Sequence, residues 1–162
     1  MQSSSKTEIV DLPVRQQSSQ RSNQVAEFNP ATVEQDLIHL SDLKQSLRKL
    51  EVGQPLSKEL TTDQVRASLS TLSRLQRLGS ELDVLEIVQR MLALYPQGKD
   101  RPDSVAEDWV RVLRDEPIAS VWAAYEAQIR STGQWAPSLG DFRARVLRHA
   151  HAVSCIMLSL QK

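Results

Sequence analysis

Apolar residues recur every three or four positions in one segment after another between residues 33 and 160, and this spacing constrains the fold more than any other feature. Such spacing places the apolar side chains along one face of an α-helix, whereas a half-buried strand would alternate apolar and polar residues. The chain has five glycines and no long alternating run of Val, Ile or Thr. The sequence therefore predicts an all-α protein, a small bundle of about six helices.

The first predicted helix, from about residue 31 to residue 51, carries a row of leucines in a heptad-like register. The row consists of Leu40, Leu43, Leu47 and Leu50. It covers barely two heptads, and three or four would be needed to indicate a coiled coil. We expect this face to lie against the core or against a partner protein, and the pattern does not distinguish the two.

Two of the later helices are predicted to begin at a capping box, in which side chains bond the free amides of the first turn. Thr61 with Gln64 predicts a helix from residue 61 to about residue 78. Ser104 with Glu107 predicts a helix that begins at residue 104. Gly79 occupies the position where a left-handed C-terminal cap would close the first of these two helices.

Three more helices are predicted, at about residues 80–94, 117–130 and 138–160. Ser80 and Ser138 are suitable N-caps for the first and last of these. The acidic residue before Pro117 is a suitable cap for the middle one. The helix at 80–94 is strongly apolar, so we expect it to be the most buried of all.

The N-terminal residues 1–30 are rich in Ser, Gln, Asn and charged side chains. A segment of this composition buries too little apolar surface to offset its conformational entropy, so it predicts a flexible, disordered arm. Ile9, Leu12 and Val14 form its one short apolar patch and its candidate recognition segment. The alternative is that the arm is a plain spacer.

The helical domain is expected to cover residues 31–162. Its parts are a leading helical pair at 33–79, a helical core at 80–148 and an apolar helix end at 149–162. The helix end is apolar almost all round, so it must be covered by the domain or by another chain.

The charge of the chain is balanced, with 20 basic and 20 acidic side chains and no strongly charged segment. Binding to nucleic acid needs a clustered positive face, so direct binding is expected to be weak or absent. A single cysteine forms no internal disulfide, the residues after Met1 are polar, and no apolar run is long enough to cross a bilayer. We therefore expect a cytoplasmic protein without membrane contact.

The sequence offers no strong candidate for catalysis, metal binding or cofactor binding. His151 and Cys155 are one helical turn apart, but neither oxyanion donors nor a glycine-rich elbow accompany them. The three histidines and one cysteine lack the spacing of a metal site. The acidic residues Glu81, Asp83 and Glu86 are explained by the macrodipole at a helix start. We expect a non-enzymatic protein that acts by binding.

Between residues 87 and 146 the order of features resembles the small helical domain of phage replicative-helicase loaders and inhibitors. In that family a helix ends in Tyr-Pro, a helix with an aromatic residue leads into Leu-x-Asp-x-Pro, and a later aromatic-x-Pro-Ser opens the last helix. The matching residues are Tyr95, Pro96, Trp109, Leu113, Asp115, Pro117, Ala124, Trp135, Pro137 and Ser138. They are mostly core and helix-boundary positions.

The resemblance implies a bacteriophage or prophage DNA-replication accessory protein that binds a hexameric replicative helicase and loads or restrains it. It also implies an origin-binding protein as a further partner. Members of the family carry a flexible helicase-binding segment after the helical domain, whereas the predicted arm precedes the domain in this chain. No contact residue therefore transfers from the family to this sequence.

Two other functions stay open from the residues themselves. A helical nucleic-acid-binding regulator would use the arginines of the last helix, and a scaffolding protein would self-associate through the leucine-rich first helix and the apolar C-terminus. The candidate partner-binding residues are Ile9, Leu12 and Val14 in the arm, Leu40, Leu43 and Leu47 in the first helix, and Arg145 and Arg148 in the last helix. On that last helix, Asp141 and Arg145 are spaced for an i to i+4 ion pair.

Overall fold

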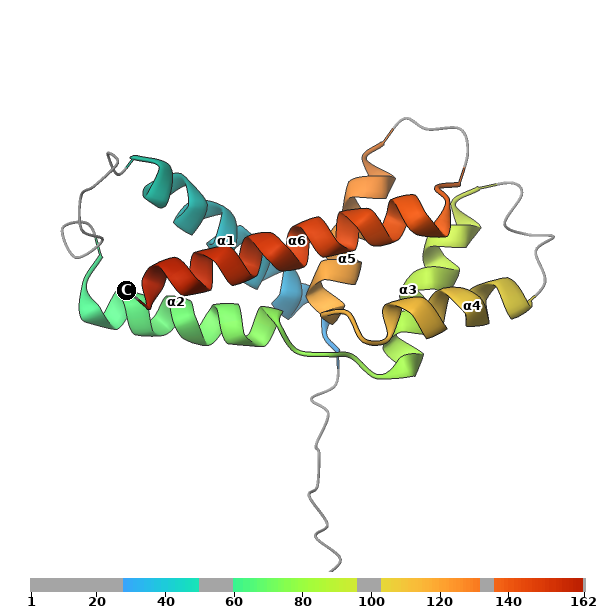
Figure 1. Ribbon diagram of the computed structural model, residues 1–162, viewed down its shortest axis with the longest axis horizontal. Coiled ribbons are helices and arrows are strands. Elements are labelled where there is room, and N and C mark those ends of the chain that lie inside the picture. The colour runs from blue at the N-terminus through green and yellow to red at the C-terminus, as the bar shows by residue number, and fades with distance from the viewer. Residues whose placement is uncertain (1–27, 50–59, 96–102, 132–135, 162) are drawn as a thin grey trace, which may run out of the picture.

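The computed structural model describes residues 28–49, 60–95, 103–131 and 136–161, and these residues form six α-helices (Figure 1). The helices are α1 (Pro30–Lys49), α2 (Thr62–Leu75), α3 (Glu81–Ala93), α4 (Asp103–Leu113), α5 (Ile118–Ile129) and α6 (Leu139–Leu160). Within these ranges the only extended pairing is an isolated bridge between Leu78 and Pro117. The predicted all-α class is confirmed. The predicted arm lies outside the described residues, apart from its last three positions.

Polar side chains start three of the helices as the sequence predicted. The Thr61 amide donates to the Gln64 side chain at 2.8 Å, and the Gln64 amide donates back to the Thr61 hydroxyl at 3.3 Å, which completes a capping box at α2. Ser80 forms a second box, with Asp83, at α3. The hydroxyl of Ser138 accepts from a backbone amide in the first turn of α6 at 3.1 Å. Each bond satisfies an amide that the helix itself leaves free.

The end of α2 differs from the prediction. The helix stops at Leu75, with Gln76 as its C-cap, and Gly79 does not adopt a left-handed conformation. A Cβ atom on Gly79 would lie 2.8 Å from both Cδ1 and Cγ1 of Ile118. The amide of Ile118 donates to the Arg77 carbonyl oxygen at 3.0 Å in the same region. The glycine is therefore needed for the close approach of two segments, and the predicted cap was wrong.

Two other predicted caps are also corrected. Asp103 already belongs to α4, so Ser104 lies inside that helix and not at its N-cap. Pro117 is the N-cap of α5, and no side chain caps it. The carboxylate of Glu116 instead accepts from the Arg143 guanidinium on α6, with Oε1 at 3.2 Å from Nη2. Glu116 thus pairs with a residue of α6 and does not cap α5.

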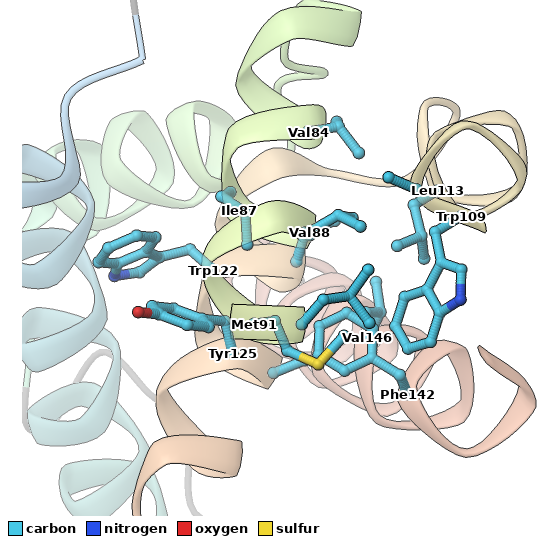
Figure 2. Packing of buried hydrophobic residues seen from close by; sticks show 14 of the residues in the cluster. Val84, Ile87, Val88, Met91, Trp109, Leu113, Trp122, Tyr125, Phe142 and Val146 are labelled. Atoms are coloured by element: carbon cyan, nitrogen blue, oxygen red, sulfur yellow. The ribbon is translucent and has the colours of Figure 1, made fainter. Parts of the chain in front are cut away.

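The first of two hydrophobic clusters joins α3, α4, α5 and the N-terminal half of α6 (Figure 2). Val88 and Met91 on α3, Trp109 on α4 and Phe142 on α6 meet at its centre. The Trp109 and Phe142 rings pack with centroids 5.4 Å apart and planes inclined by 47°. Aromatic pairs favour such tilted contacts, which bring the positive edge of one ring near the negative face of another.

The second cluster joins α1 and α2 to the C-terminal half of α6. Its fully or nearly fully buried members are Leu40, Leu43, Leu72, Leu75, Ala119, Val153, Ile156 and Leu160. In Figure 1, α6 crosses the molecule, with α2 beside its C-terminal half. Most of the apolar helix end is thus covered by the domain itself, and Leu158 remains exposed. A helix of 22 residues spans about 33 Å, long enough to serve both clusters.

The most buried helix is α5, which corrects the expectation for α3. Eight of the 12 residues of α5 are buried, against five of 13 in α3. The reason is position, because α5 packs against α3 and α6 and also contacts α1 and α2. Leu82 on α3, by contrast, points into open solvent despite its apolar side chain.

Candidate functional site

The predicted partner-binding residues do not converge on one surface. Ile9, Leu12 and Val14 lie outside the described residues. Leu40 and Leu43 are only 2% and 4% exposed, because they pack against α2 and α6 in the second cluster. Of the two expectations for the leucine row, the core-facing one therefore holds at these positions, although Leu40 also borders a groove between α1 and α5. Leu47 is half-buried at the edge of the same cluster.

The arginines of α6 are largely engaged within the chain. Arg143 donates to Glu116, as described above, and Arg145 Nη1 donates to Oε1 of the buried Gln128 at 2.7 Å. No ion pair joins Asp141 to Arg145 among the described residues, which corrects that prediction, and the Asp141 carboxylate accepts from the Ser138 hydroxyl at 2.6 Å. Arg148 is exposed.

His151 and Cys155, the one pair in the sequence that suggested nucleophilic chemistry, lie in contact at the surface. The Sγ atom of Cys155 lies 3.4 Å from Nε2 of His151, and both residues are exposed on α6. Among the described residues, no group of three His, Cys, Asp or Glu side chains is placed to hold a metal ion. The pair is therefore an i to i+4 contact on an open helix face.

His149 is the one histidine with a strongly perturbed environment. It is partly buried, and Nδ1 lies 3.2 Å from the hydroxyl oxygen of Ser120, which is fully buried on α5. Burial, and secondarily the positive charge of Lys44, lowers the pKa of His149 to about 4. The imidazole is thus neutral at pH 7 and contributes a polar but uncharged surface.

An open groove of about 580 Å³ lies beside His149, between α1 and α5. We call it the α1–α5 groove. Leu37 and Ile38 line its α1 side, and Ala123 and Ala127 line its α5 side. Ile38 is 63% exposed and lines the groove together with these other apolar side chains. The small side chains of the two alanines, one helical turn apart, leave room for another polypeptide to approach the α5 backbone.

Charged side chains of both signs border the α1–α5 groove. Glu34 and Lys44 come from α1, and Glu126 and Arg130 come from α5. Arg130 Nη2 lies 3.4 Å from Glu126 Oε2 in an i to i+4 pair at the surface. An apolar floor with a charged rim is the usual composition of a protein-binding surface.

Comparison with known proteins gives no relative. No protein-family model, no curated protein and no solved structure matches the chain. In the part of the chain that the structure describes, every helix is too short or too polar to cross a bilayer.

Four of the ten residues of the helicase-loader resemblance lie in one place. Tyr95, Trp109, Leu113 and Ala124 are buried together in the first cluster. Among the boundary residues of the resemblance, Pro117 and Ser138 are the N-caps of α5 and α6. Pro96 and Trp135 lie outside the described residues.

Sequence reasoning missed the α1–α5 groove because its two walls are separated by about 80 positions in the chain. Ile38 was a usable signal, since it is apolar and falls outside the leucine row of the first helix. Ala123 and Ala127, at i and i+4, were a second. Neither signal identifies the facing helix, which only tertiary packing determines.

Proposed function

We propose that this chain is a non-enzymatic replication accessory protein that binds a hexameric replicative helicase and loads or restrains it. The observation that most supports the proposal is the common burial of Tyr95, Trp109, Leu113 and Ala124. These four are among the ten residues that carry the resemblance to phage helicase loaders and inhibitors, and they belong to one packed unit.

The α1–α5 groove is the contact surface that we assign to this function. It combines an exposed Ile38 with the small side chains of Ala123 and Ala127. A partner helix with apolar residues at i, i+3 and i+4 would fit such a surface. The mixed charges at the rim favour a partner that carries both signs.

The direct test uses the full-length chain and the purified replicative helicase of its host. Size-exclusion chromatography with light scattering measures the complex, and strand-unwinding assays measure whether the helicase is activated or restrained. Ile38→Glu and Ala127→Glu each place a charge in the groove, and we expect each to weaken binding at least tenfold. The matched control is Leu158→Glu, which changes an equally exposed apolar residue, 58% exposed, on α6 away from the groove.

A second full-length variant tests the predicted arm, with Ile9→Ser, Leu12→Ser and Val14→Ser combined. Loss of binding in this variant but not in the groove variants would move the contact to the arm. Absence of any complex between the wild-type chain and the helicase, with no effect on unwinding, would refute the proposed function.

Nucleic-acid binding is the alternative that the same preparations address. Arg143 pairs with Glu116 and Arg145 bonds the buried Gln128, so each guanidinium group would have to give up an existing contact to reach a phosphate group. We expect weak DNA binding without the steep salt dependence that several phosphate contacts would produce. Fluorescence anisotropy at low and high salt measures this.

A further inference from the structure

A second apolar surface lies on the outer side of α3 and α4, apart from the α1–α5 groove. It is a shallow groove of about 290 Å³. Leu82, Leu85 and Val110 form its apolar part. Leu82 is 75% exposed, the most exposed large apolar residue among those described, while the other two are half-buried against the first cluster. Exposing a leucine to this extent on a regular helix leaves apolar surface that a partner could cover.

The rim of this surface carries two acidic and two basic residues, Glu81, Glu107, Arg111 and Arg114. Arg114 Nη1 lies 3.2 Å from Glu81 Oε1, which links α4 to α3, and Arg111 Nη1 lies 3.2 Å from the neighbouring Asp108. No ion pair engages Glu107 in the described part of the chain. All these ion-paired side chains are at least half exposed, so the pairs are open to exchange with a partner.

The order of charges along α4 makes the surface complementary to itself. Glu107 and Arg111 are one helical turn apart on the same helix. When two copies of α4 meet antiparallel about a two-fold axis, the acid of each copy faces the base of the other. The same contact, from Glu107 to Arg111 of the other copy, then forms twice, as a two-fold interface requires. A partner of strongly acidic or strongly basic character would gain no such advantage, because the rim has no net charge.

We propose that the α3–α4 surface binds a second copy of this chain. The two α3–α4 pairs form a four-helix contact in which Leu82 is buried and Glu107 pairs with Arg111 of the second copy. This inference is independent of the proposed function, since it uses a different surface and requires no helicase. It also differs from self-association through the first helix or the C-terminus, because the surface lies on α3 and α4.

The test is a charge exchange measured by sedimentation velocity on the full-length chain over a wide concentration range. Glu107→Arg alone and Arg111→Glu alone should each be monomeric, because like charges then face each other across the axis. An equimolar mixture of the two variants should form a dimer again, since every pair in the mixed dimer joins opposite charges. Leu158→Glu, the same control as above, should dimerise like the wild-type chain.

Each other outcome overturns the inference. A wild-type chain that is monomeric at every concentration excludes the dimer. A dimer that survives both single charge reversals places the interface elsewhere, and a mixture that fails to associate refutes the antiparallel pairing. Thermal unfolding by circular dichroism checks that the variants are folded. Leu82→Glu provides a second disruption at a largely exposed position if a charge reversal unfolds the chain.

Discussion

Arg74 on α2 binds Asp36 on α1 through two parallel hydrogen bonds, from Nε to Oδ2 at 3.0 Å and from Nη2 to Oδ1 at 2.6 Å. The hydrogen bond with Asp36 also raises the pKa of Arg74 above its ordinary value. Asp36 is buried, and Thr71 accepts a further bond from the same guanidinium at 3.1 Å. The planar guanidinium matches the carboxylate geometry, so this pair sets how α1 lies against α2.

Replacement of Asp36 with Asn should therefore destabilise the fold. The change removes a charge from a two-point contact while it keeps the shape of the side chain. We expect the free energy of unfolding to fall by about 1–2 kcal/mol, a value reduced because Arg74 is partly exposed. Urea denaturation measures it. The matched control is Asp63→Asn, since the Asp63–Arg66 pair is highly exposed and the substitution should cost only the small stabilisation of an acid in the first turn of α2. Equal effects of the two substitutions would contradict this role for Asp36.

Replacement of Gly79 with Ala should disturb the contact between the α2–α3 connection and α5. The new Cβ would meet Ile118 at 2.8 Å, and the Ile118 Cβ itself is only 3.0 Å away, so rotation of the side chain cannot relieve the clash. We expect a loss of about 1–3 kcal/mol in thermal unfolding. Gly140→Ala is the control, because the nearest atom to its Cβ would be 3.8 Å away. That variant should be unchanged or slightly more stable, since alanine favours helix over glycine.

The partly buried His149 should make the fold sensitive to acid. Its folded pKa of about 4 lies below the ordinary value of 6.5, so the unfolded chain takes up the proton first as the pH falls. Stability from this residue is thus complete above about pH 6.5 and is lost progressively down to about pH 4. Between pH 7 and pH 5 the loss should be about 2 kcal/mol.

Comparison with His149→Asn isolates this effect from the titration of carboxylates, including Glu34 and Glu126, which line the same groove. The variant should lose less stability than the wild-type chain between pH 7 and pH 5, as measured by urea unfolding at both values. His151→Asn changes an exposed histidine and should keep the wild-type pH dependence. Identical pH profiles for His149→Asn and the wild-type chain would show that burial of His149 does not control its protonation.

Arg145 should act as a structural residue. Its guanidinium bonds the buried Gln128, whose amide nitrogen donates in turn to the Tyr95 hydroxyl. Arg145→Ala leaves the Gln128 oxygen without this donor, so we expect a loss of about 1–2 kcal/mol. Arg148→Ala, on the exposed side of α6, should change stability by less than about 0.5 kcal/mol. Thermal unfolding of the two variants measures the difference, and equal stabilities would contradict the assignment.

Local sequence patterns predicted the helices well and their ends less well. The starts at Thr61, Ser80 and Ser138 depend on bonds within one turn, so residues three positions apart were sufficient to find them. The predicted caps at Gly79 and Glu116 were wrong because each residue contacts a residue far along the chain. Gly79 lies against Ile118, and Glu116 pairs with Arg143. A residue suited to a local cap can be recruited by a distant contact, and its neighbours in sequence carry no sign of this.

For the candidate surfaces too, local sequence patterns predicted some properties and distant contacts decided others. The sequence by itself determined that the chain is helical, that its leucine-rich first helix has one apolar face and that the last helix is apolar at its end, because these depend on periodicity within single segments. Only the tertiary structure decided that Leu40 and Leu43 are buried while Ile38 and Leu82 are exposed. Exposure depends on which helices pack together, and that choice is made by the summed burial of side chains from all six helices.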